Sequence, residues 1–324
     1  MTGRRIGIVL AAVVLATGWC HPAAAEEPAS VAPATWLATV AADAAKAEAD
    51  PPPAGAWKKP IPLTVGVNYT LVTDYIFRGI NFSEYAGEGR EKLNHQLGIH
   101  VAYEPEKLGK FGVVFWLEWY ADQEKLTPRC DDHLQEVDYI VYWSYPIKPI
   151  ATTVETGWIG YTFPQASGDC FCTNEWYVML SLDDAKLFGT KANVLNPYVA
   201  FYLDLDLFHP GSWLEFGVSH DFVLADFDAC KNVPVVKNLT VTPSLVVGLD
   251  HRYLNKAVGF GREATQLGNI QSGLAVSYDL SGALGLPPQY GDLILTGFFK
   301  FSNAIRDELI NDEFWGGVTV AWEW

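Results

Sequence analysis

The chain has 324 residues, and its composition excludes both a disordered polypeptide and a nucleic-acid-binding protein. It contains 12 Trp, 15 Tyr and 17 Phe residues, far more aromatic residues than a disordered chain carries. Its formal charge is −16, and cleavage of a signal peptide containing Arg4 and Arg5 makes it −18. Because nucleic-acid phosphates need Lys and Arg partners, this acidity argues against nucleic acid and favours cations as partners.

The first 25 residues have the pattern of a secretory signal peptide. Arg4 and Arg5 precede an apolar run from Ile6 to Trp19, and three alanines end at Ala25. Residues 26–59 are rich in Ala and Pro, which predicts a periplasmic linker, and the Ala-rich part of this linker has the composition for one short helix. No later window carries the roughly 18 uninterrupted apolar residues of a membrane helix, so any membrane-spanning part must be a closed sheet.

The last eleven residues, 314–324, alternate in polarity with a period of two. Val318, Val320 and Trp322 share an apolar face, and Trp324 ends the chain. This pattern is typical of the closing strand of an outer-membrane barrel. It predicts contact with outer-membrane lipids and recognition of the final strand by the barrel-assembly machinery. The alternative is a half-buried edge strand of a soluble sandwich.

From residue 60 onward the chain divides into roughly twelve alternating segments, each about 10 to 14 residues long. They predict an all-β fold, a transmembrane up-and-down antiparallel barrel over residues 60–324. The first strand is expected to run past Phe77, with Tyr75 and Phe77 facing lipid and Asp74 and Arg78 facing inward. An even strand count puts both ends of the barrel in the periplasm, with periplasmic turns at 104–109, 146–149, 184–193, 225–237 and 281–289, and outer links at 81–91, 122–134, 164–172, 208–211, 252–266 and 303–312.

The first of these segments carries a family resemblance. The run Asn68 to Ile80 reads Asn-Tyr-Thr-Leu-Val-Thr-Asp-Tyr-Ile-Phe-Arg-Gly-Ile, which resembles the opening motif of the TorF-like porin family. Residues 159–164 and 174–177 are similar to the middle region of that family. The match would cover residues 60–324. The resemblance implies an outer-membrane barrel and, by the family's label, a role in transport.

The faces assigned to the lumen are acidic. A pore walled with carboxylates attracts cations, so the pattern predicts a channel for passive diffusion of small solutes with a cation-preferring lumen. The alternative is an interior filled by carboxylates paired with Arg78, Lys300 and Tyr hydroxyls, which predicts a non-conducting structural or surface-interaction barrel. The candidate pore-lining residues are Asp74, Arg78, Glu118, Asp204, Asp206, Glu215, Asp221 and Lys300.

Among these residues, Arg78 gives the most specific prediction. An extended strand separates it from Asp74 by roughly 13 Å, too far for a salt bridge. Its partner is therefore expected on a neighbouring strand, with Glu118 and Glu323 as candidates. Such an ion pair would fix the strand register, whereas an unpaired Arg78 would gate charge at a constriction.

The cysteines that remain after cleavage predict one disulfide. In the oxidising periplasmic route, Cys130 is expected to pair with Cys170 or Cys172 between two outer links, whereas Cys230 falls in a periplasmic turn. The same two outer links also offer thiolate, imidazole and carboxylate groups, but in no standard ligand spacing. We therefore expect no metal and no other cofactor.

The sequence gives no pattern for catalysis. Ser219 and His220 are adjacent, so on a strand they point to opposite faces and cannot act as nucleophile and base for one another. Neither a G-x-S-x-G nor an H-E-x-x-H motif occurs. We expect the chain not to be an enzyme, and nothing in the alternation marks a subunit interface.

Overall fold

The computed structural model describes residues 59–85, 93–120, 134–164, 171–254, 265–305 and 310–324. No helix within these ranges is long and apolar enough to cross a membrane. The signal peptide and all but the last residue of the linker lie outside the described residues, so both stay predictions.

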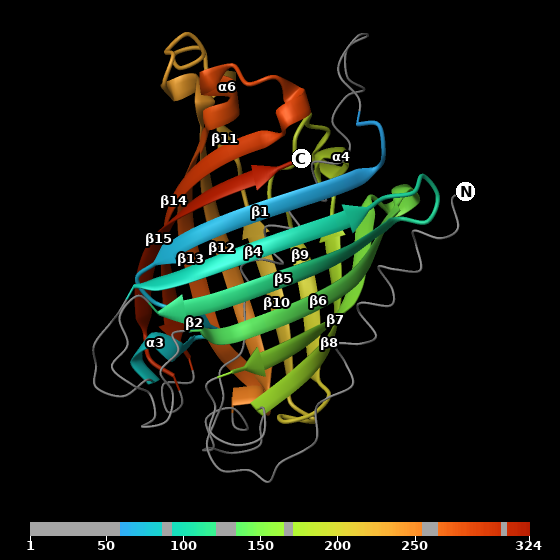
Figure 1. Cartoon of the computed structure of the whole chain (residues 1–324), viewed down its shortest axis with the longest axis vertical. Coiled ribbons are helices and arrows are strands. Elements are labelled where there is room, and N and C mark those ends of the chain that lie inside the picture. The colour runs from blue at the N-terminus through green and yellow to red at the C-terminus, as the bar shows by residue number, and fades with distance from the viewer. Residues whose placement is uncertain (1–58, 86–92, 121–133, 165–170, 255–264, 306–309) are drawn as a thin grey trace.

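Twelve long antiparallel strands form a closed barrel in the described part of the chain (Figure 1). Each strand pairs with its neighbours in sequence, and the ring closes where β1 pairs with β15, from Gly66 opposite Glu323 to Val72 opposite Gly317. The ring confirms the predicted fold class and excludes a two-layered sandwich. The wall strands are β1 (Leu63–Val72), β4 (Asn94–Tyr103), β5 (Lys110–Tyr120), β6 (Leu134–Ile147), β7 (Thr152–Phe163), β8 (Phe171–Leu182), β9 (Tyr198–Asp204), β10 (Ser212–Ser219), β12 (Leu239–His251), β13 (Thr265–Asp279), β14 (Asp292–Ala304) and β15 (Glu313–Glu323).

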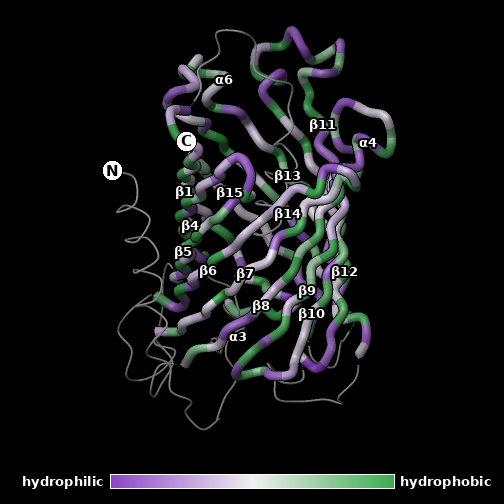
Figure 2. The backbone as a smooth tube through the Cα atoms, turned by 90° about the vertical axis from the view of Figure 1, so that its right-hand side faces the viewer, coloured by the Kyte–Doolittle hydropathy of each residue, from purple (hydrophilic) through white to green (hydrophobic). Residues whose placement is uncertain are grey.

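The two-residue alternation places apolar side chains on the outside of the ring and polar side chains within it. Hydrophobic and hydrophilic positions alternate along the wall strands (Figure 2). In β15, Val318 and Val320 are exposed on the outer face, whereas Trp315 is buried inside. In β6, the buried inner positions include Glu136 and Asp138. An apolar exterior around a polar interior suits a lipid surrounding.

Short helices and one short strand lie at one end of the barrel, where the C-terminus also lies (Figure 1). The links at this end cover residues 104–109, 148–151, 183–197, 220–238 and 280–291, close to the predicted periplasmic turns. The Trp324 backbone holds the C-terminus there, because it both donates to and accepts from the backbone of Val65. The short elements are η2 (Lys148–Ile150), α4 (Ala185–Phe188), β11 (Phe222–Val223), η3 (Leu224–Asp226), η4 (Val236–Asn238), α6 (Leu280–Leu284) and η5 (Pro288–Tyr290).

The first strand is shorter than expected. β1 ends at Val72, and the chain then turns into the barrel as β2 (Ile76–Phe77), β3 (Ile80–Asn81) and α3 (Phe82–Tyr85). The prediction that Tyr75 and Phe77 face lipid is wrong, since their exposed fractions are 3% and 2%. Its backbone N–H groups bond within the segment instead of continuing the wall ladder: the Tyr75 N–H donates to Ser83 Oγ, and the Phe82 N–H donates to the Tyr75 carbonyl. We call residues 76–81 the inner hairpin.

Candidate functional site inside the barrel

The inner hairpin turns at Arg78 and Gly79. Their φ angles are +50° and +84°, so both residues have the left-handed backbone of a two-residue type I′ hairpin turn. A Cβ atom added at Gly79 would lie 2.6 Å from Ile310 Cδ1, so the turn fits closely against the link before β15. Position 79 therefore favours glycine for its backbone conformation, and an added Cβ would also displace the end of the Ile310 side chain.

Substitution of Gly79 with Ala is expected to lower the free energy of unfolding by about 2 kcal/mol, the sum of the left-handed backbone cost and the contact with Ile310. Gly189→Ala is the matched control. Gly189 also has a positive φ, +67°, but its added Cβ would meet nothing within 4 Å. Unfolding in urea measures both variants, and equal losses would contradict the close fit at the hairpin turn.

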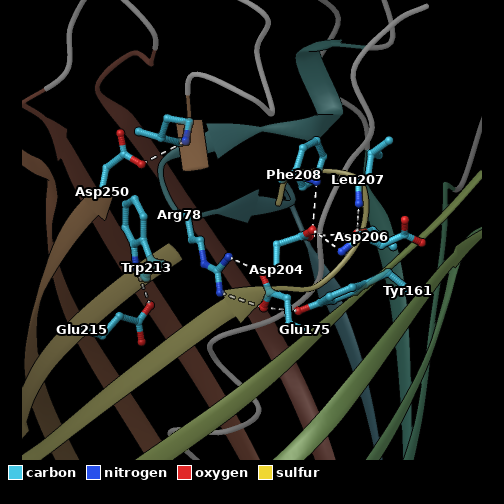
Figure 3. A network of polar contacts seen from close by, with 12 residues as sticks. Arg78, Tyr161, Glu175, Asp204, Asp206, Leu207, Phe208, Trp213, Glu215 and Asp250 are labelled. Carbon is cyan, nitrogen blue, oxygen red and sulfur yellow. Dashed lines mark hydrogen bonds and ion pairs between the residues drawn. The ribbon is translucent and has the colours of Figure 1, made fainter. Parts of the chain in front are cut away.

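Arg78, at the tip of the inner hairpin, forms a bidentate ion pair with Glu175 of β8. Nη1 lies 2.6 Å from Oε1 and Nη2 lies 3.0 Å from Oε2, and the two side chains are 2% and 0% exposed. The Tyr161 hydroxyl donates to Glu175 Oε2 at 2.9 Å, which fixes the carboxylate from the wall side (Figure 3). Charge-assisted bidentate pairs of this kind are among the stronger polar contacts in proteins.

The partners expected for Arg78, Glu118 and Glu323, are wrong. Arg78 does not extend β1, so it does not meet a neighbouring strand. The inner hairpin carries it across the lumen to β8, and β4, β5, β6 and β7 lie between β1 and β8 in the ring. The ion pair therefore joins two distant parts of the wall instead of setting the register of adjacent strands.

Aromatic rings surround the Arg78 guanidinium on its remaining sides. Its Cζ atom lies 4.3 Å from the ring centre of Tyr253, 4.6 Å from Phe77, 4.8 Å from Tyr202 and 5.7 Å from Trp213. These distances permit cation–π attraction in a site shielded from water.

The electrostatics of this site keep Arg78 charged. Burial acts to lower the pKa of Arg78, but the Glu175 carboxylate together with Tyr253 and Tyr161 outweighs burial, and the pKa lies well above its ordinary value. A permanently charged guanidinium inside the barrel is thus neutralised by one wall carboxylate.

A second group of carboxylates, Glu118, Glu136 and Asp138, faces the root of the inner hairpin. Glu118 lies directly opposite Glu136 across the β5–β6 pair, and Asp138 follows on the same face. We call these three residues the carboxylate cluster. All three are buried, Glu136 interacts with Asp138 and with the Tyr75 hydroxyl, and no basic side chain pairs with the cluster among the described residues. Buried carboxyl groups without a cationic partner must take up a proton or a cation.

Tyr75 stands where the inner hairpin approaches this cluster. Its ring lies 5.5 Å from the ring of Trp116 on β5. Burial raises the pKa of Tyr75 well above its ordinary value, and the charges of Glu136, Asp138 and Glu118 raise it further. The hydroxyl therefore stays protonated beside the acidic wall.

Asp204, a predicted pore-lining residue, organises a loop. Its Oδ2 accepts from Thr173 Oγ1 at 2.8 Å, and its Oδ1 accepts from the backbone N–H groups of Asp206 and Phe208 at 2.9 and 2.8 Å (Figure 3). β9 ends here because the carboxylate binds the turn that follows. The inner-face position expected for Asp206 is wrong, since Asp206 lies beyond β9 and is exposed.

Of the other predicted pore-lining residues, some lie in the interior and one lies at the end of the barrel where the C-terminus is. Asp74 is buried directly after β1, Glu215 is buried on β10, and half-buried Lys300 pairs with buried Trp315 on the inner face. Asp221 does not reach the inner face. It follows the end of β10, is exposed, and accepts from Thr242 Oγ1 at 2.6 Å.

Five wall carboxylates outside the predicted pore-lining residues are buried on the inner face: Glu136, Asp138, Glu155, Glu175 and Asp250. The sequence did carry a signal for Glu155 and Glu175. Val154 and Trp176 are apolar residues expected on the outer face, and their neighbours in a strand point inward.

The predicted disulfide stays a prediction. Cys130 and Cys170 lie outside the described residues, Cys172 is half-buried in β8, and Cys230 lies in the link 220–238 at the other end of the barrel. The alternative metal ligands near Cys130 also lie outside them. Within the ranges that the structure describes, no group of three or more His, Cys, Asp and Glu side chains is arranged to hold a metal ion.

A closed antiparallel barrel with an apolar exterior and a polar interior, whose first and last strands begin and end on the same side, defines the class: it has the architecture of bacterial outer-membrane barrels. Comparison by sequence assigns no family, since no family model and no curated protein matches the chain. The TorF-like resemblance therefore stays a prediction.

Several solved outer-membrane proteins are similar to the chain in fold. The KdgM porin is 10% identical, covers 79% of this chain and 98% of its own, and gives a TM-score of 0.42. The NanC porin is 10% identical, with 80% and 98% covered and a TM-score of 0.41. An outer membrane channel from Pseudomonas putida F1 is 8% identical, with 86% and 100% covered and a TM-score of 0.44.

Proposed function

We propose that the chain is an outer-membrane channel for passive diffusion of small solutes, with a preference for cations. The observation that carries the proposal is the charge of the inner wall. Among the described residues, Arg78 is the one buried Lys or Arg side chain, whereas the buried carboxylates on wall strands are Glu118, Glu136, Asp138, Glu155, Glu175, Asp204, Glu215 and Asp250.

The carboxylate cluster is the part of this wall that acts most strongly on a passing ion. Glu175 is neutralised by Arg78, and Asp204 is saturated by three hydrogen-bond donors. Glu136 and Asp138 interact with each other and with Tyr75, and no basic side chain pairs with them among the described residues. A cation that enters the lumen can replace the proton on such a buried carboxyl group, and the field of the resulting carboxylate is strongest in a narrow, low-dielectric passage, so the cluster favours cations over anions.

Single-channel recording in planar bilayers tests the proposal. We expect stepwise currents and, under a KCl gradient, a reversal potential on the cation-selective side. A folded, heat-modifiable protein that passes no current would overturn the channel, and an anion-selective reversal potential would overturn the cation preference alone.

Replacement of the cluster carboxylates is expected to weaken the cation preference. In the double variant Glu136→Gln and Asp138→Asn the reversal potential should shift toward zero, because two carboxyl groups that can exchange a proton for a cation are lost while side-chain size is kept. Asp221→Asn is the control, since Asp221 is exposed in the link 220–238, outside the lumen. Equal reversal potentials in the double variant and the parent protein would reject this role for the cluster.

One observation favours a second candidate, a non-conducting structural barrel. Tyr75, Phe77, Ile80 and Phe82 of the hairpin segment join a buried hydrophobic cluster that includes Trp116 and other wall residues. This packing occupies the interior at the level of the inner hairpin. The bilayer recordings separate the two candidates, because a filled interior passes no current.

The proposal also includes an outer-membrane location, recognition of the strand ending at Trp324 by the barrel-assembly machinery, and no catalytic activity. His220 supports the last point, since its Nδ1 lies 2.7 Å from the backbone carbonyl of Val194 and the ring packs on Phe222 at 4.2 Å. Ser219 ends β10, where its backbone N–H donates to the Leu195 carbonyl.

A further inference from the structure

We propose that the site around the Arg78 side chain is a binding site for guanidinium-type cations, which Arg78 occupies when no solute is present. The site, here called the guanidinium cage, consists of Glu175, Tyr202, Trp213 and Tyr253. A solute that carries a guanidinium group competes with Arg78 for the cage and releases the inner hairpin. This inference rests on the proposed channel, because it needs a solute to reach the lumen.

The cage matches the shape as well as the charge of guanidinium. Glu175 presents both carboxylate oxygens, which bind the two Arg78 terminal nitrogens at 2.6 and 3.0 Å. Two parallel bonds of this kind fit a planar guanidinium and do not fit a compact ammonium group. The rings of Tyr253, Tyr202 and Trp213 cover the guanidinium at 4.3 to 5.7 Å, as expected for a receptor that selects a flat, weakly hydrated cation.

The cage is held by parts of the barrel other than the inner hairpin. Glu175 lies on β8, Tyr202 on β9 and Trp213 on β10, and Tyr161 of β7 orients the carboxylate. Tyr253 follows β12, where its ring contacts Trp213 at 6.4 Å and Phe208 at 5.4 Å. The wall therefore keeps the cage assembled when the inner hairpin leaves it.

Arg78 is an incomplete occupant of the cage. Its Nε atom is buried and has no hydrogen-bond partner among the described residues. Its backbone lies in the left-handed region at φ +50°, which only glycine adopts without strain. A free guanidinium carries no such tether and is able to use all its donors, so it competes for the same carboxylate.

Release of the tip leaves the hairpin segment attached at its base. Asn81 Nδ2 donates to Glu313 Oε2 at 3.1 Å, and Asn94 Nδ2 donates to Ser83 Oγ at 2.6 Å. These contacts involve no charge on the hairpin, whereas Arg78 and Glu175 form an ion pair. Competition at the cage thus removes the ionic link between the inner hairpin and β8.

The variant Arg78→Ala, which vacates the cage in the full-length protein, tests the proposal. In vesicles, millimolar guanidinium chloride should raise its unfolding temperature and block part of its current, and equal ammonium chloride should do neither. The parent protein should need at least about tenfold more guanidinium, because Arg78 competes for the cage. Adding Glu175→Gln to Arg78→Ala should weaken guanidinium binding by at least about tenfold, the effect of losing a charged hydrogen-bond partner.

Equal responses to guanidinium and ammonium, or a response that survives Glu175→Gln, would overturn the proposal. If Arg78→Ala does not fold, Arg78→Lys undergoes the same measurement, since it keeps the charge but cannot form the bidentate pair. Selective guanidinium stabilisation without current would support the cage and refute the channel, and current without guanidinium selectivity would support the channel and refute the cage.

Discussion

Replacing Arg78 with Met is expected to lower the free energy of unfolding by about 3–5 kcal/mol, the cost of leaving a buried charge uncompensated. The Glu175 carboxylate is fully buried and would keep only the Tyr161 hydroxyl of the contacts shown in Figure 3. Met fills much of the volume of the Arg side chain, so lost packing contributes little. Urea titration of the vesicle-inserted protein measures the change.

The double variant Arg78→Met and Glu175→Gln should recover most of this loss, because the orphaned charge is gone. Lys231→Met is the control. It breaks an ion pair of 2.7 Å with Asp228 that lies in solvent in the link 220–238, and the free energy of unfolding should change little. Additive losses in the double variant would show that the pair does not couple the inner hairpin to β8.

The wall of the barrel could be predicted from the sequence because each strand obeys one local rule. Side chains alternate with period two, lipid requires one apolar face, and the turn residues mark where strands stop. The link between β4 and β5 falls at residues 104–109, as predicted. The end of the chain also behaves as expected, since Val318, Val320 and Trp322 share the exposed outer face of β15.

The inner hairpin could not be predicted from that rule. Leu71, Tyr75 and Phe77 have the same parity, so the apolar alternation continues in phase while the chain leaves the wall at Thr73. What diverts the chain is a set of hydrogen bonds to Ser83 and a tight turn at Gly79, neither of which changes the periodicity. An apolar face indicates burial against something apolar, and it does not distinguish lipid from a packed interior.

The same packing obscured Glu155 and Glu175. The inner face of β7 also carries Ile159 and Tyr161, and that of β8 carries Tyr177, all buried. Where side chains on the inner face of a strand pack around the inner hairpin, both faces of that strand are rich in apolar residues. The difference in polarity between the two faces is then small. The pairing of Arg78 with Glu175, 97 residues away, depends on the path of the hairpin and has no signature in either strand.

Replacing Val318 with Lys is expected to cost about 2–4 kcal/mol of stability in a bilayer, the penalty for a cation on the lipid face near the middle of a membrane strand. Val318 is central in β15, and 49% of it is exposed on the outer face. Its cross-strand neighbours are Leu71 of β1 and Gly297 of β14, so no carboxylate stands directly opposite to neutralise the new charge. Urea-induced unfolding from vesicles measures the cost.

Val235→Lys makes the same chemical change where we expect no lipid. Val235 is 61% exposed but lies in the link 220–238, beyond the wall strands. Its substitution should leave stability within about 0.5 kcal/mol, as is usual at a solvated surface site. If Val318→Lys is as mild as Val235→Lys, the outer face of β15 is wetted by water. The exposed valines would then have to be explained by a surrounding other than lipid, and the membrane placement of the whole ring would fail with them.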